Sequence, residues 1–376
     1  MRVLVAIDSF KGSVSSLEAG EAIKEGIEEL SKSVEIIPIA DGGEGSVEAM
    51  VTALGAKFVS VKTLDPLGRE MVAEYAIKGE LAILEMASSS GITLLTDEER
   101  NPNLTSTYGF GLMIKDAILK GARKFIVGIG GSATNDAGTG MLEALGFEFF
   151  DENGNLLKGK GESLVKIAKI SSQKVIPELK ECEFEVACDV NNPLFGTNGA
   201  AHIYGPQKGA DEEMVKSLDA GLESFAEVTA EFSGIDNSGL SGSGAAGGLG
   251  FGFVSFLNSK LLRGFEIIAK VVGLEEAIKR ADLVITGEGK LDYQSVMGKT
   301  PSEVAKLAKK HGKIVVALGG TVSGDARSLN EYVDAYFSIL NEPITLKEAM
   351  SKEVTKANLT KTSEELARLV LACRKF

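Results

Sequence analysis

VLVAIDSFKGS, residues 3–13, places a short apolar run directly before a polar, glycine-containing turn. The run Val3–Ile7 is rich in β-branched residues, which is typical of a buried parallel strand. Residues 15–18 then offer a capping box for a helix whose apolar positions recur at helical spacing. A second strand over 34–39 and a second helical stripe over 47–54 complete a βαβα pattern. This opening predicts a doubly wound sheet of parallel strands.

The same alternation of strand and helix returns near the end of the chain, with apolar strands predicted at 283–289 and 313–320. The middle is less regular, with strands predicted at 81–86, 124–129 and 184–189, and helices at 103–121 and from about residue 212. We therefore expect an α/β fold with two α/β domains. The expected Rossmann-like parallel-sheet domain comprises 1–60 plus 281–376, and a large inserted second α/β domain comprises 61–280.

The composition argues against several classes of function. The 376 residues carry a net charge of −13, whereas a nucleic-acid-binding protein normally needs a basic face. No apolar stretch approaches the ~18 residues of a membrane span, and the first apolar run is too short for a signal peptide. The three cysteines are too few for a disulfide framework and lack metal-ligand spacing. We expect a cytoplasmic protein that binds neither nucleic acid nor membrane.

A glycine-rich turn follows the strand predicted at 124–129. Its sequence, GIGGSATNDAGTGM (128–141), loosely fits a dinucleotide fingerprint through Gly128–Ala133, with Asp151 where a ribose-binding acid would lie. However, Asp136 in this turn would repel a pyrophosphate unless a cation intervened. We expect the loop to bind a phosphate together with a metal ion, or a polyhydroxy acid. The alternative is a tight turn in which Asp136 caps the following helix.

Carboxylates stand at the ends of four predicted strands: Asp8, Asp41, Asp189 and Glu288. The carboxyl ends of parallel strands converge on the ligand crevice of a doubly wound sheet. One carboxylate at such a position is often only a helix cap, but four favour a site that needs Mg²⁺ ligands or a general base. Asp292 adds a further carboxylate. The sequence does not determine how these groups divide the roles.

Cationic partners lie in glycine-containing turns: Lys11 in DSFKGS, Lys208 in GPQKGA and Lys299 in MGKT at 297–300. The last of these ends like a Walker A loop, but residue 293 is tyrosine where that pattern needs glycine. It is first of all a helix start, at which Lys299 could meet an anion. Carboxylates and lysines without an evident nucleophile suit phosphoryl transfer from a Mg–nucleotide.

The stretch GLSGSGAAGGLGFG, residues 239–252, holds seven glycines in fourteen positions. Two functional interpretations are a moving part of the active site and a nucleotide contact. The structural alternative is that its small residues permit close helix packing.

Several segments occur together in one order: DSFKGS, IPIADGGEG, TSTYGFG, GIGGSATNDAGTGM, ACDVNNPLFG, GPQKGA, GAAGGLG and TGEGKLDYQS. Together they are highly specific, and from Asp8 to beyond Gly319 the chain resembles the bacterial type I glycerate kinase family. The resemblance implies ATP-dependent phosphorylation of D-glycerate with Mg²⁺, commonly at the 2-hydroxyl to give 2-phosphoglycerate. It also implies two α/β domains with the active site in the cleft between them. Ala137, where glycine is common in the family, is a minor departure.

The roles of individual residues follow from the residues rather than from the resemblance. We expect Asp189 to accept the proton of the attacking hydroxyl, with Lys11 and Asp136 completing the catalytic group. The expected substrate-binding residues are Asp8, Ser132, Thr134, Asn135, Asn191, Asn192 and Lys208. The expected nucleotide-binding residues are Gly287, Gly289, Gln294 and Lys299. The expected Mg²⁺ ligands are Asp41, Glu288 and Asp292.

Two other functions stay open. A nicotinamide-dependent oxidoreductase would use the Gly128–Ala133 fingerprint and Asp151, and a non-catalytic sugar-acid sensor would bind glycerate without turnover. The sensor leaves the many strand-end carboxylates unexplained. The sequence does not choose firmly between the 2- and 3-hydroxyl of glycerate, and a homodimer is one of the oligomeric states it leaves open.

Overall fold

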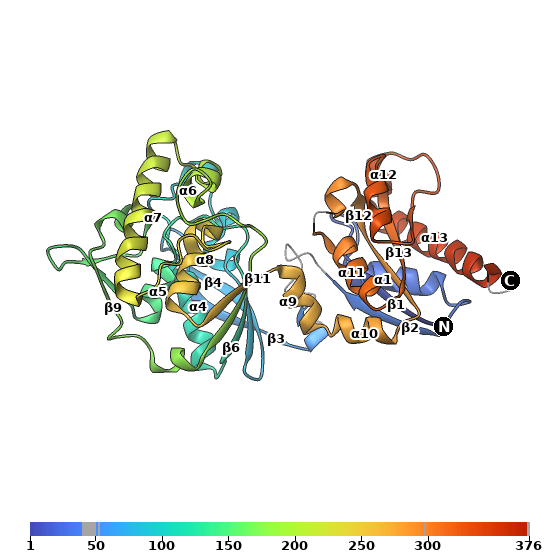
Figure 1. Cartoon of the computed structure of the whole chain (residues 1–376), viewed down its shortest axis with the longest axis horizontal. Coiled ribbons are helices and arrows are strands. Elements are labelled where there is room, and N and C mark those ends of the chain that lie inside the picture. The colour runs from blue at the N-terminus through green and yellow to red at the C-terminus, as the bar shows by residue number, and fades with distance from the viewer. Residues whose placement is uncertain (40–49, 52, 297, 374–376) are drawn as a thin grey trace. The chain divides into compact units, whose positions relative to one another are not determined.

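The computed structural model describes residues 1–39, 50–51, 53–296 and 298–373 (Figure 1). They form two compact units, each of which is described by itself. Unit 1 comprises Met1–Leu54 and Phe265–Phe376, and unit 2 comprises Gly55–Gly264. Compared with the expected domain boundaries, residues 55–60 belong to unit 2 and residues 265–280 to unit 1. Of the second predicted helix, over 47–54, the described residues 50–51 and 53–54 are helical, and the other positions lie outside the described residues.

The sheet of unit 1 has five parallel strands in the order β14-β13-β12-β1-β2. They are β1 (Arg2–Ile7), β2 (Ser33–Pro38), β12 (Leu283–Leu291), β13 (Ile314–Val322) and β14 (Ala335–Ser338). Val3 pairs with Leu283, so segments from the two ends of the chain meet inside the sheet. The strand order reverses between β1 and β12. Their carboxyl ends are therefore the topological switch point, where ligands bind in open α/β sheets.

The helices of unit 1 whose bounds lie within the described residues are α1 (Ser16–Gly26), α9 (Gly264–Val271), α10 (Leu274–Arg280), α11 (Thr300–Lys310), α12 (Leu346–Ala349) and α13 (Lys352–Cys373). The predicted capping box of α1 is present, with the Glu18 N–H donating to Ser15 Oγ at 3.3 Å. The helix α13 packs beside α1 (Figure 1). A Cβ at Gly26 would lie only 2.2 Å from the Thr360 carbonyl oxygen, so glycine permits this close approach. Apolar side chains of the sheet and both helices form one core, including Ile7, Ile23, Ile285, Leu318 and Leu359.

Unit 2 contains a six-stranded mixed sheet in the order β11-β10-β6-β5-β4-β3. Its strands are β3 (Lys57–Leu64), β4 (Glu70–Lys78), β5 (Leu81–Glu85), β6 (Lys124–Gly128), β10 (Glu183–Ala187) and β11 (Ser259–Leu262). The strands from β5 to β11 pair in parallel, whereas β3 and β4 run antiparallel to their neighbours. A small antiparallel sheet consists of β7 (Glu148–Phe150), β8 (Leu156–Leu157) and β9 (Lys169–Ser171). The expected α/β fold with parallel sheets is confirmed.

The helices of unit 2 are α3 (Ala87–Ser90), α4 (Tyr108–Leu119), α5 (Thr139–Leu145), α6 (Ala200–Tyr204), α7 (Glu212–Ser233) and α8 (Ala245–Phe256). The helix predicted over 103–121 begins only at Tyr108. The residues before it make tertiary contacts instead: Thr105 Oγ1 donates to the Ala133 carbonyl oxygen at 2.9 Å, and the Thr107 side chain binds Asp136. Because contacts with distant residues determine where this helix begins, the local sequence carries no signal of its start.

Short 3₁₀ turns connect the larger elements: Ile92–Leu94, Asp97–Glu99, Gly161–Lys166, Pro177–Glu181, Pro206–Lys208, η6 (Tyr293–Val296) and Ala326–Glu331. Within the described ranges, no helix is both long and apolar enough to cross a membrane.

Candidate active site

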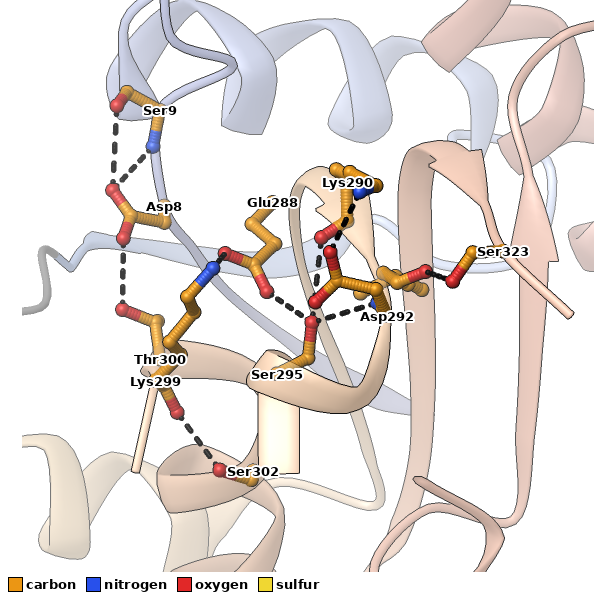
Figure 2. Close-up of polar contacts among 11 residues, drawn as sticks. Asp8, Ser9, Glu288, Lys290, Asp292, Ser295, Lys299, Thr300, Ser302 and Ser323 are labelled. Carbon is orange, nitrogen blue, oxygen red and sulfur yellow. Dashed lines mark hydrogen bonds and ion pairs between the residues drawn. The ribbon is translucent and has the colours of Figure 1, made fainter. Parts of the chain in front are cut away.

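Asp8 and Glu288 lie at the switch point of unit 1 (Figure 2). The Asp8 N–H donates to the Gly287 carbonyl oxygen at 3.0 Å, which ties the ends of β1 and β12 together. Asp8 is buried, and its carboxylate accepts hydrogen bonds from the Ser9 N–H at 2.6 Å and from Thr300 Oγ1 at 2.9 Å. Its own turn and the start of α11 therefore hold this carboxylate in place.

Glu288 is a half-buried carboxylate with one hydroxyl donor and one cation nearby (Figure 2). Ser295 Oγ donates to Oε1 at 2.5 Å, and Lys299 Nζ lies 3.8 Å from Oε2. Burial raises the pKa of Glu288 and the carboxylates of Asp8 and Asp292 raise it further, whereas Ser295 and Lys299 lower it. Burial is the largest cause of this rise, and the two neighbouring carboxylates add negative charge that a bound cation would offset.

The turn after β12 joins Glu288 to Asp292 through Ser295 (Figure 2). The Asp292 N–H donates to Ser295 Oγ at 3.1 Å, and Lys290 Nζ lies 2.9 Å from Asp292 Oδ2. Two of the three expected Mg²⁺ ligands, Glu288 on β12 and Asp292 just after it, are therefore linked through the Ser295 hydroxyl. The third, Asp41, lies outside the described residues, as does the side chain of Gln294.

A cavity of about 520 Å³ opens at this carboxylate group, and all of its lining residues belong to unit 1. Its charged lining residues are Asp8, Lys11, Glu288, Lys290 and Lys299. Gly289 also lines it, whereas Gly287 has a packing role, because a Cβ there would lie 2.0 Å from the Leu318 carbonyl oxygen. The cavity continues along an apolar side formed by Ile339, Leu340, Ile344, Leu346, Ala349 and Met350. The structure thus brings Asp8, Lys11, Gly289 and Lys299 to one cavity.

The described residues at the carboxyl ends of β1 and β12 could bind a divalent cation only if a bound ligand supplied further oxygens. Within the described ranges, no three or more acidic, histidine or cysteine side chains are arranged to hold a metal ion. Mg²⁺ does not need such a cage, because one or two carboxylates usually hold it together with substrate phosphates and water. Glu288 and Asp292 supply oxygens of this type, and after burial the neighbouring Asp8 and Asp292 carboxylates also raise the pKa of Glu288.

In unit 2, the loop 128–141 connects β6 to α5 around the buried carboxylate of Asp136. This carboxylate accepts hydrogen bonds from the Thr107 N–H and Oγ1, both at 2.8 Å, from the Gly138 N–H at 3.1 Å and from the Gly140 N–H at 3.2 Å. Burial raises the pKa of Asp136, and these hydrogen bonds oppose that rise. The carboxylate therefore orders the loop and the start of α5, and a catalytic role for it stays a prediction.

Lys208 is buried beside the same loop. Its Nζ donates to the Thr134 carbonyl oxygen at 2.6 Å, and burial lowers its pKa to about 7, opposed by the Asp136 carboxylate. Thr134 Oγ1 and both amide atoms of Asn135 are also buried, and in the described part of the chain they have no hydrogen-bond partner. Ser132 is buried near them in the loop. Buried polar atoms without partners are costly, so these atoms are candidates for binding water or a polar ligand.

Asp189, Asn191 and Asn192 follow β10 at its carboxyl end. Asn191 Oδ1 accepts a hydrogen bond from Ser241 Oγ at 2.8 Å, and Asn192 Oδ1 accepts one from the Tyr204 hydroxyl at 2.6 Å. The two amides therefore hold neighbouring loops in place. Asp189 is an exposed carboxylate, and its Oδ1 accepts a hydrogen bond from the Gly264 N–H at 3.1 Å.

Asp151, the ribose-binding acid of the oxidoreductase alternative, lies in the turn of the β7–β8 hairpin. Its Oδ1 accepts hydrogen bonds from the Asn153 N–H at 2.9 Å and the Asn155 N–H at 2.8 Å. These contacts shape the turn itself. Asp151 thus has a structural explanation that needs no dinucleotide.

The sequence did not single out Ser295, Thr300 as a partner of Asp8, or the apolar segment 339–350. Ser295 stands in a conspicuous motif, but a serine carries no signature of the carboxylate it will bind. The partners of Thr300 could not be read from its neighbours either, because Asp8 is 292 positions away. The apolar segment has no periodic pattern that would have marked it as a cavity wall.

Comparisons with known proteins agree over the whole chain. The model of the glycerate kinase family matches residues 3–371. A glycerate kinase of Halalkalibacterium halodurans is 43% identical over 355 residues, 93% of this chain and 93% of that protein. The glycerate 2-kinase of Escherichia coli K12 is 43% identical over 354 residues, again 93% of each chain. The crystal structure of a provisionally assigned glycerate kinase 2 from Salmonella typhimurium LT2 is similar with a TM-score of 0.91, at 39% identity and with full coverage of both chains.

Proposed function

Because the chain belongs to the glycerate kinase family, we propose that it is a phosphotransferase that moves the γ-phosphoryl group of ATP to the 2-hydroxyl of D-glycerate. The observation that carries the proposal is the unit 1 cavity, which is lined by three lysines and by the carboxylates of Asp8 and Glu288 at the switch point of a parallel sheet. The name of the Escherichia coli relative, glycerate 2-kinase, supports the 2-hydroxyl. D-Glycerate and ATP are the two small-molecule substrates.

In this proposal the charged end of the cavity receives the phosphates of ATP. Lys11 and Lys299 supply positive charge there, and Gly289 allows the nucleotide to approach the backbone. Glu288 and Asp292 would hold Mg²⁺, which neutralises charge on the phosphate oxygens when bound. Because in-line transfer needs little covalent chemistry, the main task of these residues is to position the phosphates and to balance their charge.

The acceptor hydroxyl needs a proton acceptor, and Asp189 fits this role better than Asp136. Asp136 is enclosed by hydrogen-bond donors of its own loop. Asp189 is exposed, and its Oδ1 accepts a backbone hydrogen bond from the Gly264 N–H at 3.1 Å, which orients the carboxylate. The buried polar atoms of Thr134 and Asn135 are candidates for binding glycerate oxygens, directly or through water.

The direct test is ³¹P NMR of the products formed from D-glycerate, Mg²⁺ and ATP, with L-glycerate as the matched control. We expect 2-phosphoglycerate and ADP from the D-enantiomer. Formation of 3-phosphoglycerate would support the kinase activity but show that the 3-hydroxyl, and not the 2-hydroxyl, accepts the phosphoryl group. If ATP stays intact with D-glycerate, the proposed activity is wrong.

The base assignment is tested by Asp189→Asn. Loss of a general base typically lowers kcat by a factor of about 10² to 10⁴. Asp211→Asn is a suitable control, because Asp211 caps α7 and asparagine caps a helix about equally well. A near-normal kcat with an unchanged pH profile in Asp189→Asn would show that another group accepts the proton.

A further inference from the structure

The apolar side of the unit 1 cavity is not needed for phosphate chemistry. It is formed by the segment that leaves β14 and runs through α12. Its lining residues are Ile339, Leu340, Ile344, Leu346, Ala349 and Met350. Leu346 is 75% exposed, Met350 40% and Leu340 38%. Large apolar side chains gathered at the mouth of a concave site indicate a ligand that covers them.

This apolar side is attached to the charged end of the cavity. A Cβ at Gly12 would lie 2.7 Å from the terminal methyl group of Met350, so the start of the chain and the end of α12 pack together. Gly12 directly follows Lys11, which lines the charged end. The hydroxyls of Ser13 and Thr355 are 2.6 Å apart, and Thr355 Oγ1 donates to the Ala349 carbonyl oxygen at 2.9 Å.

The position of α12 is defined by its own cap as well. The Thr345 N–H donates to Glu348 Oε2 at 2.9 Å, and the Glu348 N–H donates to Thr345 Oγ1 at 3.3 Å. This capping box fixes the direction of the short helix that carries Leu346. The apolar side chains therefore stand on an ordered support next to the cations.

We propose that the apolar segment 339–350 holds the nucleobase and ribose of the nucleoside triphosphate whose phosphates lie at the charged end. The inference rests on the proposed function and assigns the other half of the same site. A ligand with a polyanionic end and a flat, largely apolar end matches a cavity that is lined by lysines and by a separate segment of aliphatic side chains. The volume of about 520 Å³ lies in the range of small-molecule sites.

Glycerate does not fit the apolar segment as its occupant. Its carboxylate and hydroxyl groups need polar partners, and burying them against leucine and methionine would leave hydrogen bonds unmade. A nucleobase instead offers two apolar faces that aliphatic side chains can cover. The segment therefore sets the affinity for the nucleotide rather than for the acceptor.

The test is the double variant Leu346→Ala/Met350→Ala in the full chain, together with the single variant Leu346→Ala. We expect the KM and Kd for ATP to rise about tenfold in the double variant, with the KM for D-glycerate unchanged. The Kd for inorganic tripolyphosphate, which has the phosphates but no base, should not change. The single variant should show a smaller rise, and because Leu346 is mostly exposed we expect it to fold normally. Leu369→Ala, an exposed position of α13 outside the cavity lining, is the matched control.

Different results separate this inference from the proposed function. If the wild-type protein is an active kinase and the double variant binds ATP equally tightly, the inference is wrong while the proposed function stands. An equal loss of tripolyphosphate binding would also overturn it, because the effect would then come from the charged end. If the wild-type protein neither binds nor consumes ATP, the proposed function fails, and the inference fails with it.

Discussion

Replacing Lys208 with methionine is expected to change how the stability of unit 2 depends on pH. Lys208 is fully buried, and burial lowers its pKa from the ordinary value of 10.5 to about 7. Folding therefore removes a proton that the unfolded chain keeps over much of the alkaline range. Methionine has a similar length and packs well in irregular interior spaces, but it carries no proton.

The sign and size of the effect follow from the two pKa values. Stability rises with pH wherever the unfolded state binds more protons than the folded state, and for Lys208 this window runs from about pH 7 to pH 10.5. The cost of burying the amine in its charged form is fully present below this window and disappears as the pH rises through it. At about 1.4 kcal/mol per pH unit, the wild type should gain about 3 kcal/mol over Lys208→Met between about pH 7 and pH 9.5.

Urea unfolding of the full chain, followed by circular dichroism at a series of pH values, measures this difference. Lys216→Met, at an exposed position of α7, makes the same chemical change without burial. We expect the difference between wild type and Lys208→Met to grow with pH, and the difference for the control to stay constant. NMR of ¹³C-labelled lysine side chains gives a direct reading, because the resonance missing from Lys208→Met should titrate near pH 7. A pH-independent stability difference, or titration of that resonance near pH 10.5, would refute the reasoning.

Three further substitutions test other contacts. Gly247→Ala should lower the free energy of unfolding by roughly 2–5 kcal/mol, because the residue has φ +70° and its Cβ would lie 2.0 Å from the Thr134 carbonyl oxygen. Gly239→Ala is the control: a Cβ there would have no atom within 4 Å, so the free energy of unfolding should change little in the same urea titration. Thr300→Val should cost about 1–3 kcal/mol by removing the hydroxyl donor of the buried Asp8 carboxylate, whereas Thr300→Ser should keep most of the stability. Ser295→Ala removes the hydrogen bond that lowers the pKa of Glu288, so this pKa should rise further. The acid limb of the pH–rate profile should then move to higher pH. If the acid limb does not move, the ionisation of Glu288 does not control the activity.

The repeating elements were predictable from short stretches of sequence. Apolar runs such as 3–7 and 283–289 predicted strands of the parallel sheet, and both are present as β1 and β12. Burial on both faces of a parallel sheet forces such runs to be nearly continuous, so the signal is local. Asp8 was predictable as a strand-end carboxylate for the same reason, whereas β12 continues beyond Glu288 to Leu291.

The partners of these carboxylates were not predictable, because they depend on tertiary contacts between distant segments. Asp8 binds Thr300 across 292 positions, and Lys208 binds the carbonyl oxygen of Thr134 across 74 positions. The chemical state of a group follows from such partners and from burial. This is why the sequence named Asp136 and Asp189 as similar candidates, while the structure encloses the first with donors and exposes the second.

The glycine-rich stretch 239–252 is better explained by close backbone contact than by mobility. A Cβ at Gly247 would lie 2.0 Å from the Thr134 carbonyl oxygen, and a Cβ at Gly244 would lie 2.1 Å from that of Pro193. The Ala137 N–H donates to the Gly247 carbonyl oxygen at 3.0 Å. The stretch thus joins the loop after β6 to the loop after β10, the two loops that carry most of the expected substrate-binding residues. A moving part would have to break these contacts in every cycle, so the glycines of this stretch fix the spacing of the two loops.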